Sequence, residues 1–121
     1  MSDNLDPHEL HRAVAAYRDA AAQYGDHTEA GDTALANKYG KLASRLFEKI
    51  KAEGSDVQEQ LILLFDDPSP AVRYYAAINS REIGLSGGEA VLESLAADAT
   101  PTVIRHFALR ALRRLRTGSP Y

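Results

Sequence analysis

Apolar residues recur along the N-terminal half of the chain at the three- and four-residue spacing of an α-helix. This pattern predicts a first helix that ends at Gly25 and a second helix over residues 33–52, with the polar residues 26–32 as the turn between them. The predicted apolar stripes are Leu10, Val14, Tyr17, Ala21 and Tyr24 in the first helix, and Leu35, Tyr39, Leu42, Leu46 and Ile50 in the second. We expect these two helices to form a hairpin.

Four shorter helices are predicted in the C-terminal half, over residues 56–65, 70–83, 89–97 and 100–116. Ser69 can cap the second of these, and Pro70 suits its first position. The residues expected to point inward are Leu61, Ile62, Leu64 and Phe65, followed by Val72, Ala76, Asn79 and Ile83. No segment alternates like a strand, so the sequence predicts an all-α fold of six helices in three hairpins.

The C-terminal half contains an internal repeat with an offset of 32 residues, which places Asp66 over Asp98. Residues 72–76, Val-Arg-Tyr-Tyr-Ala, then fall on residues 104–108, Ile-Arg-His-Phe-Ala. Each copy has an apolar helix, an Asp turn, a proline near the start of its second helix, and then the aliphatic-Arg-x-aromatic-Ala pattern. A repeat of two helices at this period is typical of an α-solenoid, in which neighbouring hairpins stack to cover their apolar faces. The small Ala76 and Ala108 should let the paired helices approach closely.

The pattern Asp-x-x-x-x-Val-Arg-x-x-Ala, from Asp67 to Ala76, resembles the short HEAT-like repeats. This resemblance implies one domain: an N-terminal hairpin over 1–54, two HEAT-like repeats over 55–116, and a tail over 117–121. A Tyr-rich hairpin followed by Leu-Phe-Asp-Asp-Pro-Ser-Pro-Ala-Val-Arg also looks like a family of small bacterial proteins catalogued as a domain of unknown function. Members of that family occur near polymorphic-toxin genes, which implies an immunity-like protein.

The Asp and Arg residues of the repeat have two interpretations. Arginine is well suited to clamp a phosphate or a carboxylate. The resemblance to HEAT-like repeats instead implies that each Arg bonds to the Asp turn of its own or a neighbouring hairpin and orders the stack. We expect the structural role for Asp66, Asp67, Arg73, Asp98 and Arg105.

A second group of residues forms a candidate partner-binding surface. Tyr74, Ile78 and Arg81 share one face of the helix over 70–83. The repeat maps them onto His106, Arg110 and Arg113. In HEAT-like stacks the second helices line the concave side, and aromatic and Arg residues suit interface hot spots. The alternative is that this stripe packs, half-buried, against the second helix. Tyr17, Tyr24 and Tyr39 are expected to be core residues with hydroxyls that reach water, or else to line a ligand slot.

Composition removes several classes of function. The chain of 121 residues has no cysteine, so it cannot hold a disulfide or a thiolate metal site. No apolar run is long enough to span a membrane, and the start does not look like a signal peptide, so we expect a cytoplasmic protein. His8 and His11 are three residues apart, but two ligands rarely hold a metal. No catalytic triad, phosphate loop or zinc motif is present, so we expect no enzyme, no metal and no cofactor.

The sequence therefore predicts a protein-binding module, and the resemblance implies that it binds and neutralises a cognate toxin domain. A net charge of −3 would help to steer a basic toxin toward it. One alternative is a nucleic-acid-binding protein that uses the basic C-terminal helix, although Arg113, Arg114 and Arg116 also suit the C-terminal end of a helix dipole. Another alternative is a structural adaptor or homo-oligomer.

Overall fold

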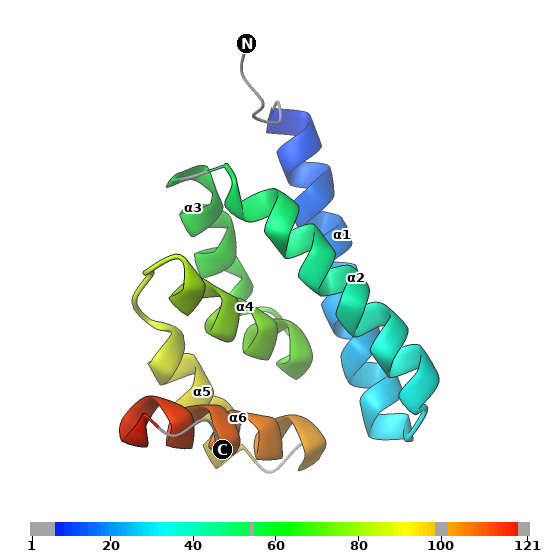
Figure 1. Ribbon diagram of the computed structural model, residues 1–121, viewed down its shortest axis with the longest axis vertical. Coiled ribbons are helices and arrows are strands. Elements are labelled where there is room, and N and C mark those ends of the chain that lie inside the picture. Colours follow the sequence, from blue (N-terminus) through cyan, green and yellow to red (C-terminus); the bar gives the residue numbers. More distant parts are fainter. Residues whose placement is uncertain (1–6, 54, 99–101, 119–121) are drawn as a thin grey trace.

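The computed structural model describes residues 7–53, 55–98 and 102–118, and these residues form six helices and no strand (Figure 1). The helices are α1 (Pro7–Ala30), α2 (Thr33–Lys51), α3 (Ser55–Leu64), α4 (Pro70–Glu82), α5 (Gly88–Ala97) and α6 (Thr102–Thr117). The prediction of an all-α fold with six helices is confirmed. The predicted start of the last helix at residues 100–101 and most of the predicted tail over 117–121 lie outside the described residues.

The first helix is longer than its sequence predicted. The prediction that it ends at Gly25 is wrong, because α1 continues to Ala30 and the turn consists of Gly31 and Asp32 alone. Gly25 is instead a packing residue, since a Cβ atom at this position would collide with the methyl group of Ala71 in α4. Gly31, at φ +80°, adopts the left-handed conformation that ends a helix, and Asp32 then caps α2 by accepting a hydrogen bond from the backbone of Leu35 at 3.1 Å.

The α1–α2 hairpin packs along its whole length, but α2 uses a different face from the predicted one. Its fully buried residues are Ala36, Ala43, Phe47 and Ile50. The other residues of the predicted stripe, Leu35, Tyr39, Leu42 and Leu46, are half-buried. Two alanines lie at the centre of the contact because small side chains let helices approach closely, and the larger leucines flank it.

The centre of the larger core is Tyr17, which is 0% exposed. Its ring lies 6.0 Å from that of Phe47 and 6.5 Å from that of Tyr75, measured between ring centroids. Its hydroxyl accepts a hydrogen bond of 2.6 Å from the side-chain amide of Asn79. The prediction that this hydroxyl reaches water is therefore wrong. Burial raises the pKa of Tyr17, and the hydrogen bond from Asn79 offsets part of that rise.

The fourth helix belongs to two cores. Ala76 is buried in the core built with α1, α2 and α3, while the next residue, Ala77, is buried in a smaller core. The buried members of the smaller core are Ala77, Leu92, Leu95, Ala108 and Leu112. Ala76 and Ala108 are both 0% exposed, which agrees with the expected close helix contacts.

The predicted inward residues of α3 and α4 are confirmed in part. Leu61, Leu64, Val72 and Asn79 are buried, whereas Phe65 and Ile83 are half-buried. Ile62 is 48% exposed, so its predicted inward position is wrong. The short α3 presents only one stripe to the core, and Ile62 lies on the other side of the helix from that stripe.

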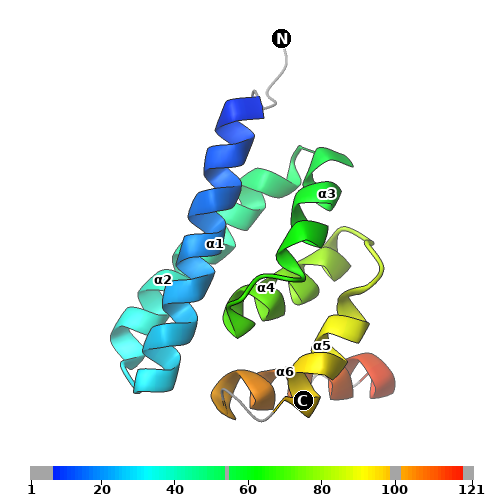
Figure 2. The ribbon, with the colours of Figure 1, turned by 180° about the vertical axis from the view of Figure 1, so that it is seen from behind.

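The helices alternate between two layers. Figure 1 shows α2, α4 and α6 on the near side, and the reverse view in Figure 2 shows α1, α3 and α5 in front. Each predicted hairpin packs as a pair, and α1 also packs against α4 and reaches α6. The HEAT-like solenoid itself stays a prediction. None of the described helices has the length and apolar character that a membrane span requires.

Candidate binding surface

The Asp turn before α4 is held by α1 rather than by the Arg of the repeat. Arg18 donates to both carboxylate oxygens of Asp67, from Nε at 2.6 Å and from Nη2 at 3.1 Å. The same carboxylate accepts from the backbone of Ser69, whose hydroxyl caps α4 as predicted. Asp66 is exposed, and the buried Nε of Arg73 has no hydrogen-bond partner among the described residues. The predicted bond between Arg73 and the Asp turn is therefore wrong, because Arg18 occupies the carboxylate of Asp67.

The second copy of the repeat is also held by α1, through the opposite charge. The carboxylate of Glu29 accepts from the backbone amides of Val103 and Ile104, at 3.0 and 3.3 Å. It therefore caps the first turn of α6 from another hairpin. Arg105 donates to the carbonyl of Ala96 near the end of α5, at 2.9 Å, while Asp98 marks the end of that helix. Arg105 thus bonds to a helix carbonyl, where the sequence predicted an Asp.

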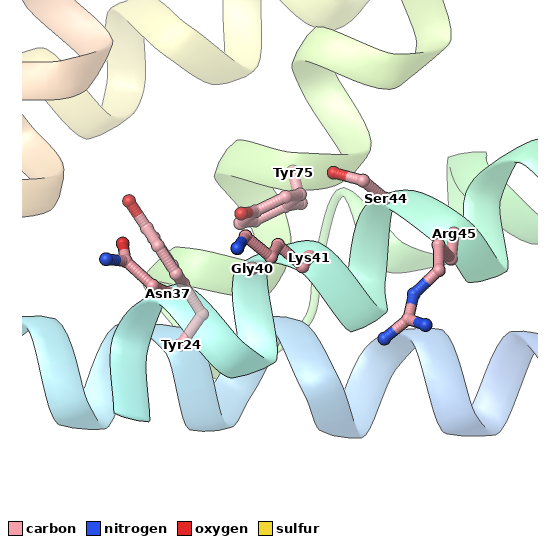
Figure 3. A pocket seen from close by; sticks show the side chains of 7 residues that line it. All are labelled: Tyr24, Asn37, Gly40, Lys41, Ser44, Arg45 and Tyr75. Carbon is pink, nitrogen blue, oxygen red and sulfur yellow. The ribbon is translucent and has the colours of Figure 1, made fainter. Parts of the chain in front are cut away.

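An open groove of about 710 Å³ runs along α2 where α4 packs against α1 (Figure 3). Its lining residues are Tyr24, Asn37, Gly40, Lys41, Ser44, Arg45 and Tyr75. Gly40 makes room for the two tyrosines, because a Cβ atom there would lie 3.1 Å from Cδ1 of Tyr24 and 3.3 Å from the hydroxyl of Tyr75. Glycine inside a helix costs about 1 kcal/mol relative to alanine, so the close approach of these rings explains its position.

A smaller hollow of about 190 Å³ adjoins the first, and Tyr24 lines both. Its lining residues are Tyr24, Tyr74, Phe107, Arg110, Ala111 and Arg114. Neighbouring rings form a continuous row: the centroid of Tyr24 lies 5.2 Å from that of Tyr75, Tyr75 lies 5.9 Å from Tyr74, and Tyr74 lies 6.0 Å from Phe107. We refer to the two hollows and this row of four rings as the aromatic groove.

Basic side chains border the aromatic groove at both ends. Lys41 and Arg45 lie at one end, and Arg110 and Arg114 at the other. All four are exposed, and none forms an ion pair with an acid in the described part of the chain. Burial raises the pKa of Tyr74, and the guanidinium groups of Arg114 and Arg110 offset part of that rise.

The layer of helices that contains α2, α4 and α6 is basic as a whole. The helices α2, α4 and α6 hold twelve of the 14 Lys and Arg residues but only two acids, Glu48 and Glu82. The twelve are Lys38, Lys41, Arg45, Lys49, Lys51, Arg73, Arg81, Arg105, Arg110, Arg113, Arg114 and Arg116. The helices of the other layer hold two cations, Arg12 and Arg18, and eight acids. The net charge of −3 therefore conceals two layers of opposite sign.

The structure divides the six residues predicted for the partner-binding stripe. Tyr74 and Arg110 line the same hollow, whereas Ile78 packs against the smaller core. Arg81, His106 and Arg113 are exposed and do not line the aromatic groove. The role of the stripe in binding stays a prediction.

Sequence reasoning missed most of the residues that line the groove, although one signal was present. Tyr75 and Phe107 occupy the aromatic position of the repeat, to which the sequence pattern assigned no role. Tyr24 was expected either in the core or in the lining of a ligand slot, and it is half-buried and lines both hollows. Lys41 and Arg45 had not been selected, because no sequence pattern indicates that α4 leaves this face of α2 open.

No metal site is apparent in the described residues, where no three His, Cys, Asp or Glu side chains gather. His8 and His11 are exposed on α1. His27 stacks on the ring of Tyr39 with the centroids 5.4 Å apart, so its ring contributes to packing at the end of the α1–α2 hairpin.

The fold and the site together define a small all-α protein with one cation-bordered aromatic groove. Comparisons with protein-family models, with curated proteins and with solved structures find no match to the chain. The resemblance to HEAT-like repeats and to immunity-like proteins therefore stays a prediction.

Proposed function

We propose that the protein is a binding module for another protein and that the aromatic groove is its working surface. The observation that carries this proposal is the meeting of two open hollows at Tyr24. Half-buried rings form their floor, and the cations at their rims have no ion-pair partner in the described part of the chain. Aromatic and Arg residues are enriched among interface hot spots, where rings supply contact area and cations supply directed hydrogen bonds. We further propose that this layer is the concave side of a short HEAT-like α-solenoid.

The tyrosines of the groove suit hydrogen bonding as well as apolar contact. Tyrosine hydroxyls keep their protons at neutral pH and can donate to a bound partner, and burial raises the pKa of Tyr74 and Tyr75 further above its ordinary value. Asn37 and Ser44 of α2 add polar side chains to the lining (Figure 3). A groove that combines apolar rings with several donors favours a specific partner over general apolar adhesion.

The narrower proposal is that the partner is a toxin domain, which the protein binds and neutralises. It is supported by the resemblance to immunity-like proteins alone. Such a toxin must present an acidic surface, because the groove lies on the basic layer and attracts negative charge. Steering of a basic toxin by the net charge of −3 is no longer an argument for it.

Nucleic acid is the second candidate partner. It is favoured by the unpaired cations on α2 and α6 beside aromatic rings, since single strands bind to basic grooves and stack their bases on aromatic side chains. Its signature is an affinity that falls steeply as salt is raised.

Co-purification with two matched variants tests the proposal. Arg45→Glu reverses a charge in the groove, and Arg12→Glu makes the same change at an exposed position of α1, in the other layer. We expect the wild type and Arg12→Glu to retain one stoichiometric protein partner from a lysate at low and at moderate salt, and Arg45→Glu to lose it.

Three results would contradict the proposal. Nucleic acid that washes off with salt would assign the groove to the second candidate. Recovery of the protein alone, as an oligomer, would indicate a structural adaptor. Equal loss of the partner in Arg12→Glu would move the interface to another face.

A further inference from the structure

Four acids of α2, α4 and α5 pair with cations that do not line the aromatic groove. Among the described residues, no Asp or Glu lines either hollow. Glu48 and Glu82 pair with Lys51, and Glu89 and Glu93 pair with Arg116. The cations at the rims of the groove have no ion-pair partner among the described residues, whereas Lys51 and Arg116 of the same layer are paired.

The four rim cations flank an apolar middle. Lys41 and Arg45 project from α2 at one end, Arg110 and Arg114 project from α6 at the other, and Tyr24 lies between them because it lines both hollows. Along the groove, cations are followed by aromatic rings and then by cations again. A complementary ligand therefore carries negative charge at both ends and an apolar group between them. The groove is open along its length and does not enclose its contents, so it fits a segment of a chain better than a small molecule.

The geometry of the rings distinguishes a protein segment from a nucleic acid. Tyr75 meets Tyr24 at 84° and Tyr74 at 88°, so each pair is arranged edge to face. Part of the ring surface that a base would stack on is therefore covered by a neighbouring ring. What remains accessible is a set of ring edges and hydroxyls, which suit an inserted side chain and carboxylate acceptors.

We propose that the aromatic groove binds an acidic protein segment in which carboxylates flank an aromatic or aliphatic anchor. The anchor contacts Tyr24 and Tyr75, and the carboxylates pair with Lys41 and Arg45 at one end and with Arg110 and Arg114 at the other. This inference rests on the proposed function and specifies the chemistry of its partner. Opposite charge at the rim raises the association rate and sets the orientation of the segment, and the anchor supplies the buried contact.

Fluorescence anisotropy with synthetic peptides tests the inference. The probe is labelled Glu-Glu-Glu-Leu-Phe-Leu-Glu-Glu-Glu, its counterparts carry Gln or Lys in place of Glu, and an oligothymidylate of similar length represents nucleic acid. We expect the acidic peptide to bind about tenfold more tightly than the Gln peptide at low salt, because several exposed ion pairs each add a small amount. Arg45→Glu should reduce this difference clearly, because it removes one of the four cations and adds an acid, and Arg12→Glu should keep it.

A second variant reports on the groove without changing its charge. Gly40→Val places a branched side chain against Tyr24 and Tyr75, so it should weaken binding of both the acidic and the Gln peptide. Circular dichroism confirms that each variant is folded before its affinity is compared.

The remaining outcomes separate this inference from the proposed function. If the acidic and Gln peptides bind equally well, and Gly40→Val abolishes the binding of both, the inference of an acidic segment is overturned. The groove would then still be a protein-binding site. Binding of the oligothymidylate alone would overturn both. Self-association that Arg45→Glu abolishes, with no peptide bound, would overturn the inference and assign the groove to a second copy of the chain.

Discussion

The two copies of the repeat, α3–α4 and α5–α6, share a sequence pattern but are fastened to the rest of the protein in different ways. Arg18 of α1 binds the Asp turn of the first copy, and Glu29 of α1 caps the second helix of the second copy. These two anchors are eleven residues apart in the sequence, which is about three helical turns, so they project from the same side of α1. The hairpin without the repeat signature thus supplies the contacts that order both copies.

The copies also differ in what they are packed against. The second helix of the first copy covers Tyr17 and contributes Val72 and Ala76 to the larger core. The second helix of the second copy has only the smaller core, together with a few contacts to α1 and α4. We therefore expect α4 to be the more stable helix and α6 to open first.

The largest expected effect is at the centre of the larger core. Tyr17→Ala should lower the free energy of unfolding by about 3–5 kcal/mol, because it leaves a cavity beside Phe47 and Tyr75. Tyr17→Phe should cost about 1–3 kcal/mol, because it leaves the amide of Asn79 without its buried partner. Chemical denaturation measures both variants. Equal stability of Tyr17→Phe and the wild type would contradict the buried hydrogen bond.

The anchor of the first copy comes next. Asp67→Ala removes a carboxylate whose side chain is 9% exposed and that accepts from Arg18 and Ser69. We expect a loss of about 1–2 kcal/mol in unfolding free energy, since Arg18 is itself partly exposed and water screens the pair. Asp66→Ala is the matched control, because Asp66 is the adjacent exposed acid. Similar losses of stability in the two variants would show that any substitution in the turn is destabilising, and that the contact between Arg18 and Asp67 adds nothing of its own.

The anchor of the second copy should have a smaller and more local effect. Glu29→Ala removes the cap on α6 and should cost about 1 kcal/mol. Amide hydrogen exchange should then become faster in α6 while α4 keeps its protection. Equally faster exchange in α4 would indicate that the two copies unfold as one unit. That result would contradict the expectation that α6 opens before α4.

The smallest effect is expected at the Arg of the repeat itself. Arg73→Met keeps much of the aliphatic stem and removes a buried Nε–H that has no partner among the described residues. We expect the melting temperature to stay close to that of the wild type. A loss as large as that of Asp67→Ala would show that Arg73, and not Arg18, orders the first copy.

Helical periodicity and caps were enough to predict most elements of the fold. The number of helices, the start of α2, and the Ser69 cap with Pro70 all follow from local spacing and local hydrogen bonding. The prediction that the first helix ends at Gly25 was wrong because two kinds of glycine look alike in sequence. One kind ends a helix, and the other allows a second helix to pack closely against it. Only Ala71, far along the chain, distinguishes them.

The site was less predictable than the fold, for a related reason. Tyr75 and Phe107 could be found from the repeat, and the separation of charge between alternate helices could be counted directly. The groove itself depends on α1 packing against α4, which leaves Lys41 and Arg45 beside open space. No local pattern encodes that contact, so the sequence does not indicate that this face of α2 lines a groove.

The most direct test of the central claim is to map where the acidic peptide binds. Two-dimensional NMR of the uniformly ¹⁵N-labelled protein, titrated with Glu-Glu-Glu-Leu-Phe-Leu-Glu-Glu-Glu, reports the shift of each backbone amide. The largest shifts are expected along the aromatic groove, at Gly40, Lys41, Tyr75 and Ala111. Shifts concentrated on α3 and α5, or none at saturating peptide, would contradict the assignment of the aromatic groove as the working surface.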